Sequence, residues 1–282
     1  EDEEPMLGVT WDAAHGAVLA YDELMGENNT DKEACPDLPG LPEPSDDIEH
    51  DLAPLPIAEC RLKFIEASKR YAKIDTSADF AINSKYKAAQ IYFNYRHFDE
   101  SRPLFLDITR DAPDSEAAVF ASNYLLETYR LKKEYEEMRG VINDLKSNSA
   151  FMANTTPMMP EMIRVINLYE EALDYKVCEE KESKKRWEEA ARCYEDYALK
   201  HKGSEDAAKA RWNASIAWEQ SNEVGRAIEA RVALLTSGDS DEHTKALAPR
   251  AMYAIALNYH SLAVYSEAAR FYEMFVKQFP ED

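Results

Sequence analysis

Glycine and long apolar runs are both scarce in this chain. Its 282 residues include only 8 glycines, and 31% of them are charged, a composition that favours helices over sheets. No alternating run of β-branched residues bounded by turn residues is present, so we expect no sizeable sheet. No stretch approaches the roughly 18 to 20 apolar residues that a membrane-spanning helix needs. No apolar region of a signal peptide is found. The sequence opens with acidic residues before Pro5, and we expect such an opening at the start of a processed, mature protein.

Motifs that carry enzymatic chemistry or bind cofactors are also missing. The six histidines include no HExxH pair, and neither the phosphate-binding GxxxxGK[ST] nor GxGxxG nor GxSxG occurs. The acidic loop of a calcium site is absent as well. Adjacent acids such as Glu136 and Glu137 are expected on solvated helix faces. We therefore predict no catalytic residue, no metal site and no cofactor, because no acid, base and stabilising group can be assembled.

Positive charge is nearly absent from the first 60 residues, which hold 17 acids and one base, Lys32. Their net charge is −16, whereas the other 222 residues are nearly balanced at −5. Binding to a nucleic-acid backbone depends on clustered Lys and Arg. Nucleic acid is therefore not expected as a direct partner.

Two distant segments share one pattern of small, aromatic and proline residues. The first set is Ala89, Tyr92, Ser101, Phe105, Ile108 and Pro113, and the second, at the same mutual spacings, is Ala256, Tyr259, Ala268, Tyr272, Phe275 and Pro280. In each set a small residue and a tyrosine end one helix, a second helix follows, and proline closes the unit. A recurring helical hairpin is typical of a repeat array.

This pattern resembles the tetratricopeptide repeat, with a small residue at unit position 8, tyrosine at 11, a small residue at 20, an aromatic residue at 24 and proline at 32. The resemblance covers about residues 78–282 and implies an all-α, right-handed solenoid of antiparallel helix pairs. Repeats two to four lack the terminal proline. Phe279-Pro280 and Ala112-Pro113-Asp114-Ser115 are similar to segments of bacterial cell-envelope proteins of the outer-membrane assembly lipoprotein and Tol–Pal coordinator types.

Three segments are expected along the chain: an acidic, proline-rich segment at 1–56, a first tetratricopeptide-like block at 57–148 and a second at 149–282. A helix at 57–74 precedes five repeats, at 78–112, 115–148, 160–201, 204–238 and 241–279. We assign their position-11 aromatics as Tyr92, Tyr129, Tyr175, Trp218 and Tyr259. This assignment gives the third repeat an interhelix turn several residues longer than the family norm. The last helix is very apolar for an exposed end, so we expect the second block to be truncated or covered there.

The N-terminal segment divides into a helix and a connector. A helix is predicted at 11–25, capped by Thr10 and ended by Gly26, with an apolar stripe that must be buried. The proline-rich stretch 27–56 cannot be regular helix. It is either a linker, with the short helix docked on the first repeats, or an acidic strap that lies in the groove of the array and regulates access.

The four cysteines leave two interpretations open. They are either free, partly buried thiols in a reducing cytosol, or Cys35 and Cys60 form a disulfide across the proline-rich stretch in an oxidising compartment. No CxxC spacing suggests zinc. A bond between Cys178 and Cys193 is not expected, because the long turn assigned to repeat three places them at different heights.

In tetratricopeptide folds the first helix of each pair lines the concave face with unit positions 2, 5, 9 and 12. Position 5 is assigned to Tyr86, Asn123, Tyr169, Trp212 and Tyr253. Further partner-binding candidates are Phe93, Arg130, Lys176 and His260 at position 12 and Arg250 at position 2. Aromatic residues beside Arg and Lys suit capture of a peptide or a partner helix. The alternative is that these aromatics pack against the adjacent repeat.

Together these features favour a non-enzymatic scaffold that binds a partner protein or peptide through the groove. The resemblance implies a bacterial envelope complex and the periplasm or cell envelope, with the cytoplasm as the alternative location. A second hypothesis is a structural subunit of a motility, secretion or assembly machine with no free peptide groove. A third is an enzyme or a glycan-binding module, in which Trp212 and Tyr253 would stack on sugar rings.

Overall fold

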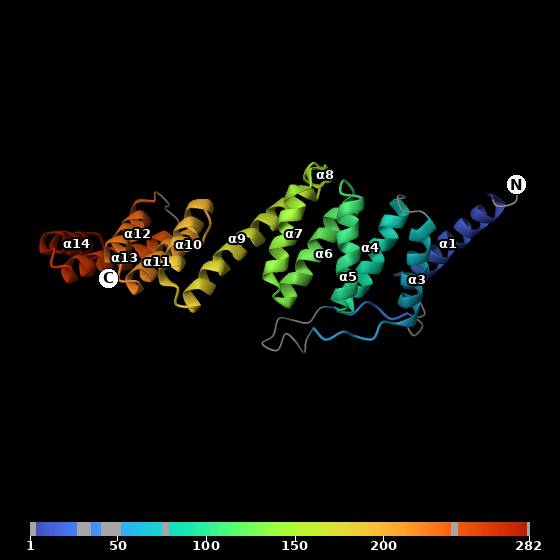
Figure 1. Ribbon diagram of the computed structural model, residues 1–282, viewed down its shortest axis with the longest axis horizontal. Coiled ribbons are helices and arrows are strands. Elements are labelled where there is room, and N and C mark those ends of the chain that lie inside the picture. Colours follow the sequence, from blue (N-terminus) through green and yellow to red (C-terminus); the bar gives the residue numbers. More distant parts are fainter. Residues whose placement is uncertain (1–3, 27–34, 41–51, 75–78, 238–241, 281–282) are drawn as a thin grey trace. The chain divides into compact units, whose positions relative to one another are not determined.

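The computed structural model describes residues 4–26, 35–40, 52–74, 79–237 and 242–280. These residues form thirteen helices and no strand, so the prediction of an all-α fold is confirmed for this part of the chain (Figure 1). The helices are α1 (Glu4–Met25), α3 (Glu59–Ile74), α4 (Asp79–Asn94), α5 (Phe98–Asp111), α6 (Glu116–Lys132), α7 (Tyr135–Ser147), α8 (Ser149–Met152), α9 (Met159–Ser183), α10 (Trp187–Lys200), α11 (Ala207–Gln220), α12 (Val224–Thr236), α13 (Glu242–Ser261) and α14 (Tyr265–Gln278).

Helices that follow one another in the chain pack in pairs. α4 lies against α5, α6 against α7, α11 against α12 and α13 against α14. α1 packs against α3 in the same way, although residues 26–58 separate the two helices. The chain divides into two compact units, Glu1–Asn167 and Leu168–Asp282. This division falls within α9, later than the predicted boundary after residue 148.

Five hairpin turns share one backbone geometry that contains no glycine. In the first, Arg96 has a φ of 64°, its N–H bonds to the carbonyl of Phe93, and the next N–H bonds to that of Tyr92. This is the Schellman arrangement, which satisfies the last carbonyls of a helix. The residues with positive φ in the five turns are Arg96, Lys133, Lys185, Asn222 and Ala263. Because L-residues pay a steric cost there, the repeated geometry indicates that packing of the paired helices holds each turn.

The turn geometry corrects the register of the third hairpin. In the first, second, fourth and fifth hairpins the carbonyl that accepts the second Schellman bond belongs to the predicted position-11 aromatic, for example Tyr92 or Trp218. In the third hairpin it belongs to Lys181, six residues after Tyr175. The predicted long turn is therefore wrong. The extra residues lengthen α9, because the stretch after Tyr175 contains no glycine or proline that would end the helix.

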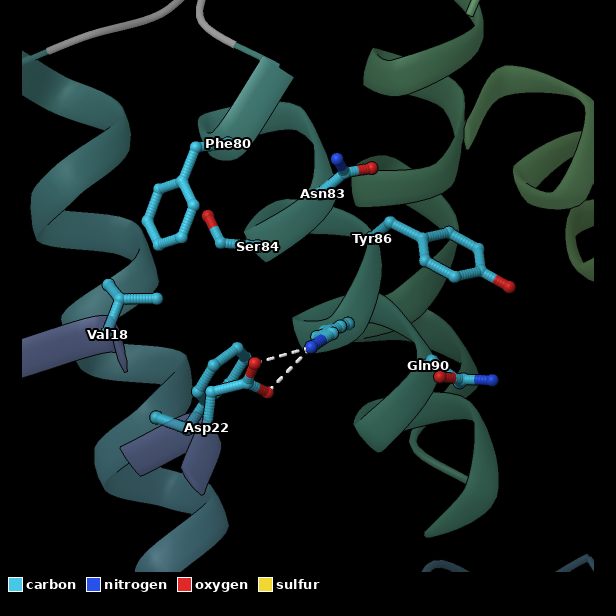
Figure 2. A pocket seen from close by; sticks show the side chains of 9 residues that line it. Val18, Asp22, Phe80, Asn83, Ser84, Tyr86 and Gln90 are labelled. Atoms are coloured by element: carbon cyan, nitrogen blue, oxygen red, sulfur yellow. Dashed lines mark hydrogen bonds and ion pairs between the residues drawn. The ribbon is translucent and has the colours of Figure 1, made fainter. Parts of the chain in front are cut away.

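The N-terminal helix begins earlier than predicted. α1 starts at Glu4, so Thr10 lies inside the helix instead of capping it, and Gly26 follows its last residue. Pro5 is compatible with this start because the first N–H groups of a helix have no partner within it. Val18 is 1% exposed within a cluster that includes Phe64 and Tyr71, and Ala14, Tyr21 and Met25 are half-buried against this cluster. Trp11 of the same stripe is 36% exposed, so the apolar stripe of α1 is buried only in part. Figure 2 shows Val18 of α1 next to Phe80 of α4.

Part of the proline-rich connector binds the hairpin between α4 and α5. The N–H of Leu55 donates to the carbonyl of Tyr95 at 2.9 Å, and the Leu55 carbonyl lies 2.8 Å from Nε2 of His97. Arg61 donates to the carbonyl of Pro36 at 2.6 Å. These contacts attach the connector to a hairpin turn and to α3. Residues 27–34 and 41–51 of the predicted strap at 27–56 lie outside the described residues.

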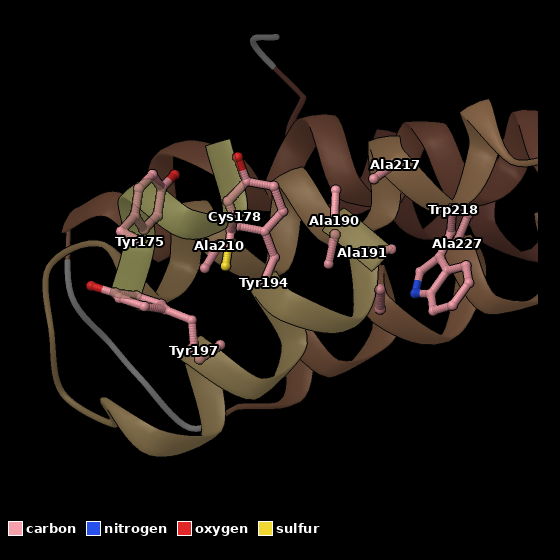
Figure 3. Close-up of a cluster of buried hydrophobic side chains, with 13 residues drawn as sticks. Tyr175, Cys178, Ala190, Ala191, Tyr194, Tyr197, Ala210, Ala217, Trp218 and Ala227 are labelled. Atoms are coloured by element: carbon pink, nitrogen blue, oxygen red, sulfur yellow. The ribbon is translucent and has the colours of Figure 1, made fainter. Parts of the chain in front are cut away.

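The core of the second unit is built from alanines and tyrosines. Ala190 of α10 and Ala210 and Ala214 of α11 are fully buried, and such small side chains let the two helices approach closely. Three tyrosines fill the space beside them, and the ring of Tyr175 lies 5.5 Å from that of Tyr194 and 5.0 Å from that of Tyr197 (Figure 3). Burial is the main cause that raises the pKa of each of these phenols.

Candidate functional site

A cleft of about 390 Å³ opens between α1, α3 and α4 in the first unit. Asn83, Tyr86 and Gln90 lie along one side of it, and the sequence pattern assigns them to positions 2, 5 and 9 of the first predicted repeat (Figure 2). The cleft therefore lies on the helix face that the sequence predicts for a groove. Its lining residues are Val18, Asp22, Phe64, Phe80, Asn83, Ser84, Tyr86, Lys87 and Gln90.

The floor of the cleft is apolar. Val18 is 1% exposed and Phe64 is fully buried, and half-buried Phe80 lies beside them. A ligand side chain that covers such a floor gains roughly 25 cal/mol for each Å² of apolar surface removed from water. The floor therefore suits an apolar side chain of a partner, since apolar surface dominates most ligand pockets.

The rim of the cleft carries an ion pair that a charged ligand can displace. Lys87 Nζ of α4 lies 2.5 and 2.8 Å from the two carboxylate oxygens of Asp22 of α1, as the dashed lines in Figure 2 mark. The two side chains are 48% and 35% exposed. Ion pairs this exposed contribute only about 0.2–1 kcal/mol. A charged group of a ligand can therefore compete for either partner at little cost.

Hydrogen-bonding groups of the first hairpin continue toward α6. The amide of Gln90 donates to the hydroxyl of Tyr124 at 3.1 Å. The ring of Tyr86 lies 6.2 Å from that of Phe105 and 6.1 Å from that of Tyr124, and these two rings stack on each other. Burial, followed by the neighbouring Tyr124, raises the pKa of Tyr86 above its ordinary value. The phenolic hydroxyl can donate and accept hydrogen bonds. The arrangement can bind a peptide side chain and its polar neighbours.

The predicted groove residues of the first unit have different environments. Phe93 is 3% exposed and packs against Phe98 and Tyr124, so it offers no surface to a partner, and its assignment to the groove is wrong. Asn123 is exposed on α6, and Arg130 is exposed beside Glu127 of the same helix. The aromatic contacts of Phe93 correspond to the alternative interpretation, packing against the adjacent repeat.

In the second unit the corrected register changes two of the candidates. Position 5 of the third hairpin is Tyr175, which is 7% exposed, and position 12 is Glu182. Tyr169 and Lys176 were assigned to these positions and occupy neither of them. The error follows from the six-residue shift between Tyr175 and Lys181.

The candidates of the last two hairpins keep their assigned positions. Trp212 is half-buried with the guanidinium of Arg231 5.4 Å from its ring. Tyr253 is 46% exposed, and Arg250 and His260 are exposed on the same helix. These aromatics therefore range from largely covered to open, instead of forming one exposed row.

Sequence reasoning missed a buried polar cluster in the second unit. Arg231 of α12 is 1% exposed and donates through both terminal nitrogens to Glu219 of α11, each at 2.8 Å. Asn258 of α13 donates to the same carboxylate at 2.6 Å. The hydrogen bond from Arg231 is the main cause that lowers the pKa of Glu219. No sequence spacing signals this cluster, because its members come from three helices.

All four cysteines are paired. Cys35 bonds to Cys60, the pair that the sequence analysis considered, and Cys178 of α9 bonds to Cys193 of α10. The expectation against the second bond is wrong, and the shifted register explains why. Cys178 precedes Lys185 of the turn by seven residues and Cys193 follows it by eight, so the two lie at similar heights on antiparallel helices. Their Cα atoms are 5.4 Å apart.

The described part of the chain shows neither a candidate membrane span nor a cluster of metal-ligating side chains. None of its helices combines the length and the hydrophobicity that crossing a bilayer requires. Within the same ranges no three His, Cys, Asp or Glu side chains gather in a way that could hold a metal ion. Comparison of the sequence with models of protein families and with curated proteins finds no match.

Proposed function

We propose that this protein is a non-enzymatic scaffold, a right-handed tetratricopeptide-like solenoid that binds a partner protein or peptide. The observation that carries the proposal is the cleft in the first unit, where positions 2, 5 and 9 of one helix border an apolar floor and a weak ion pair. Apolar pockets with a few polar groups at the rim are typical binding sites. The cleft would receive one apolar side chain of the partner.

Two disulfides support an oxidising compartment, the periplasm or cell envelope of a Gram-negative bacterium. Cys35–Cys60 and Cys178–Cys193 account for every cysteine of the chain. Structural disulfides persist in secreted and periplasmic proteins and are rare in a reducing cytosol. The resemblance to envelope proteins points to the same compartment.

A second candidate function is a structural subunit of a larger motility, secretion or assembly machine. Leu199 of α10 is 64% exposed, and Val276 of α14 is 66% exposed. Both belong to second helices of pairs, outside the predicted groove positions. A larger assembly would bury such side chains.

A peptide selection can test the binding proposal. Displayed random peptides would be selected on the full chain, and their affinities measured by fluorescence anisotropy for the wild type and two variants. Asn83→Trp places a large side chain on the exposed rim of the cleft, and Asn143→Trp makes the same change on the exposed face of α7. We expect Asn83→Trp to weaken binding by at least about tenfold, equivalent to about 1.4 kcal/mol.

The control should bind within about twofold of the wild type, a free-energy difference of about 0.4 kcal/mol. Circular dichroism on both variants would show that their helical content is unchanged. Failure to select any peptide, or equal loss of affinity in both variants, would contradict the assignment of the cleft as a binding site.

A further inference from the structure

A groove of about 260 Å³ lies between α10 and α12 in the second unit. All of its lining residues belong to α10, α11 and α12, so it shares none with the cleft of the first unit. Leu199 is 64% exposed next to the buried Ala198, and Ala233 is exposed on the other wall. Small side chains let another helix approach closely, and the exposed leucine offers that helix apolar surface to cover.

The two walls of the groove run in the same direction, opposite to α11. Trp218, near the end of α11, lies beside Arg192 and Arg226, which are near the starts of α10 and α12. Arg211, near the start of α11, lines the groove together with residues near the ends of both walls. Residues at matching depths of α10 and α12 therefore lie at the same end of the groove.

Two arginines at the beginning of the walls are held on one aromatic ring. The guanidinium of Arg192 lies 5.5 Å from the ring centroid of Trp218, and that of Arg226 lies 4.6 Å from it. Trp218 is 1% exposed, and its indole N–H donates to Glu195 at 2.7 Å, so the ring has a fixed position (Figure 3). Stacking occupies the face of a guanidinium, whereas its N–H groups lie in the plane and can still donate to a carboxylate.

The chain itself supplies little carboxylate to these arginines. Arg192 lies 3.9 Å from Glu188, and the two side chains are 58% and 61% exposed, so this pair contributes little stability. Within the described ranges no acid lies at ion-pair distance from Arg226. An acidic side chain of another molecule can therefore bind at this end without displacing a strong internal contact.

Both walls present a base, an acid three residues later and an apolar residue seven residues after the base. These residues are Arg192, Glu195 and Leu199 on α10, and Arg226, Glu229 and Ala233 on α12. Positions three and seven apart share one face of a helix, and seven residues span about 10.5 Å. The groove therefore changes from basic through acidic to apolar over about two helical turns.

From this order of charges we propose that the groove binds an amphipathic helix of a partner protein, with an acid, a base and a large apolar residue at positions i, i+3 and i+7. The acid would face the two arginines, the base would face the two glutamates, and the apolar side chain would cover Leu199. Laying the apolar face of a helix in a groove is a common mode of peptide recognition.

The direction of the partner helix follows from its own stability. A helix that begins with the acid has negative charge in its first turn, where the helix macrodipole favours it. An acid that precedes a base by about one turn also stabilises a helix more than the reverse order does. The partner helix therefore runs parallel to α10 and α12. This docking is additional to the proposed binding in the first-unit cleft.

Synthetic peptides test the inference on the full chain with both disulfides intact. The matched probe is a fluorescein-labelled, alanine-rich peptide of about 20 residues, long enough to be helical alone, with Glu, Lys and Leu at i, i+3 and i+7. The exchanged probe has the same composition with Glu and Lys interchanged. Fluorescence anisotropy should give a dissociation constant of about 10 µM to 1 mM for the matched probe. The exchanged probe should bind at least about tenfold more weakly, because it puts like charges opposite one another.

Three variants locate the binding surface. Arg226→Glu should weaken binding of the matched probe by at least about tenfold and strengthen binding of the exchanged probe. Ala233→Trp places a large side chain at an exposed position in the apolar end and should weaken binding of both probes. The control Lys132→Glu makes the same change of charge on the exposed face of α6 and should leave both affinities within about twofold of the wild type. Circular dichroism identical to that of the wild type would show that a variant is folded.

Absence of saturable binding up to about 1 mM would overturn the inference. So would equal affinities of the two probes for the wild type, or a matched-probe affinity that both groove variants leave unchanged. Asn83→Trp should bind the matched probe as the wild type does, and a loss of affinity there would also contradict the groove. Peptides selected on the first-unit cleft should in turn bind Ala233→Trp normally, so each site can fail without the other.

Discussion

The cluster around Arg231 makes the stability of the second unit sensitive to one carboxylate. Arg231 is 1% exposed, and its guanidinium bonds to both oxygens of Glu219 at 2.8 Å. If Glu219 is replaced by Ala, the guanidinium keeps its charge, since arginine does not deprotonate in proteins. Breaking a buried ion pair in this way costs about 3–5 kcal/mol. We expect about 3 kcal/mol for Glu219→Ala, because the Glu219 side chain is 34% exposed and water screens part of the effect.

Removing both charges should cost no more than removing one. In Glu219→Leu/Arg231→Met no charge is left unpaired, and apolar replacement of a buried ion pair is often neutral or stabilising. Only the amide of Asn258 loses its partners, at about 1–3 kcal/mol. The double variant should therefore be at least as stable as Glu219→Ala, even though it carries one more substitution.

Urea unfolding followed by tryptophan fluorescence measures this difference. Trp187, Trp212 and Trp218 lie in the second unit, and only Trp11 lies in the first, so the signal reports mainly the unit that contains the cluster. The control Glu229→Ala removes an exposed carboxylate from α12 and should change the unfolding free energy by less than about 0.5 kcal/mol. A loss below about 1 kcal/mol for Glu219→Ala would refute the reasoning, as would a double variant that is less stable than Glu219→Ala.

Three further predictions follow from particular contacts. The folded-state pKa of Glu219 lies below its ordinary value. The stability that this carboxylate adds to the folded state is therefore present above about pH 4.3 and is lost as the pH falls through the lower folded-state pKa. Between pH 6 and about 3, the urea midpoint should fall more for the wild type than for Glu219→Gln. Mass spectrometry without reductant should show Cys178 linked to Cys193, and free thiols in protein from an oxidising compartment would contradict the bond. The double variant Cys178→Ser/Cys193→Ser should have an unfolding free energy of the second unit that is lower by about 3 kcal/mol, as a loop of about 15 residues predicts. Ala263 has a φ of 57°, whereas Ala269 is exposed within α14. Thermal denaturation should show that Ala263→Gly is neutral or stabilising by up to about 1 kcal/mol and that Ala269→Gly is destabilising by about 1 kcal/mol. Equal effects of the two substitutions would show that the backbone geometry of the turn does not determine how glycine changes the stability.

The pairing of helices could be predicted from the sequence wherever two hairpins have the same kinds of residues, small or aromatic, at the points where their helices cross. Ala89, Tyr92 and Ser101 match Ala256, Tyr259 and Ala268, because two helices can cross closely only beside small side chains. The third hairpin has Lys181 at the tyrosine position, so counting from the nearest tyrosine led to Tyr175. That single substitution caused the wrong turn length and the wrong expectation for Cys178 and Cys193.

Of the helices that line the candidate site, only α4 carries the repeat pattern, so only its lining residues could be predicted from the sequence. Asn83 and Tyr86 were placed on one side of α4 because positions three residues apart share one side of a helix, and both residues line the cleft. Val18 and Asp22 complete the cleft from α1, and no local sequence pattern states which helix α1 packs against. Phe93 was misplaced for a related reason, since its burial depends on Tyr124 of the next hairpin.

The Cys35–Cys60 disulfide also determines how far α1 can travel. Without the bond, α1 is joined to α3 by residues 26–58, but the bond shortens this path to the residues between Gly26 and Cys35. The nine residue-to-residue steps from Gly26 to Cys35 span at most about 32 Å when fully extended. If α1 detached from α3, it would therefore remain close to its own binding surface at a high effective concentration. Reduction of this bond would lengthen the tether and allow another helix to compete for the same surface.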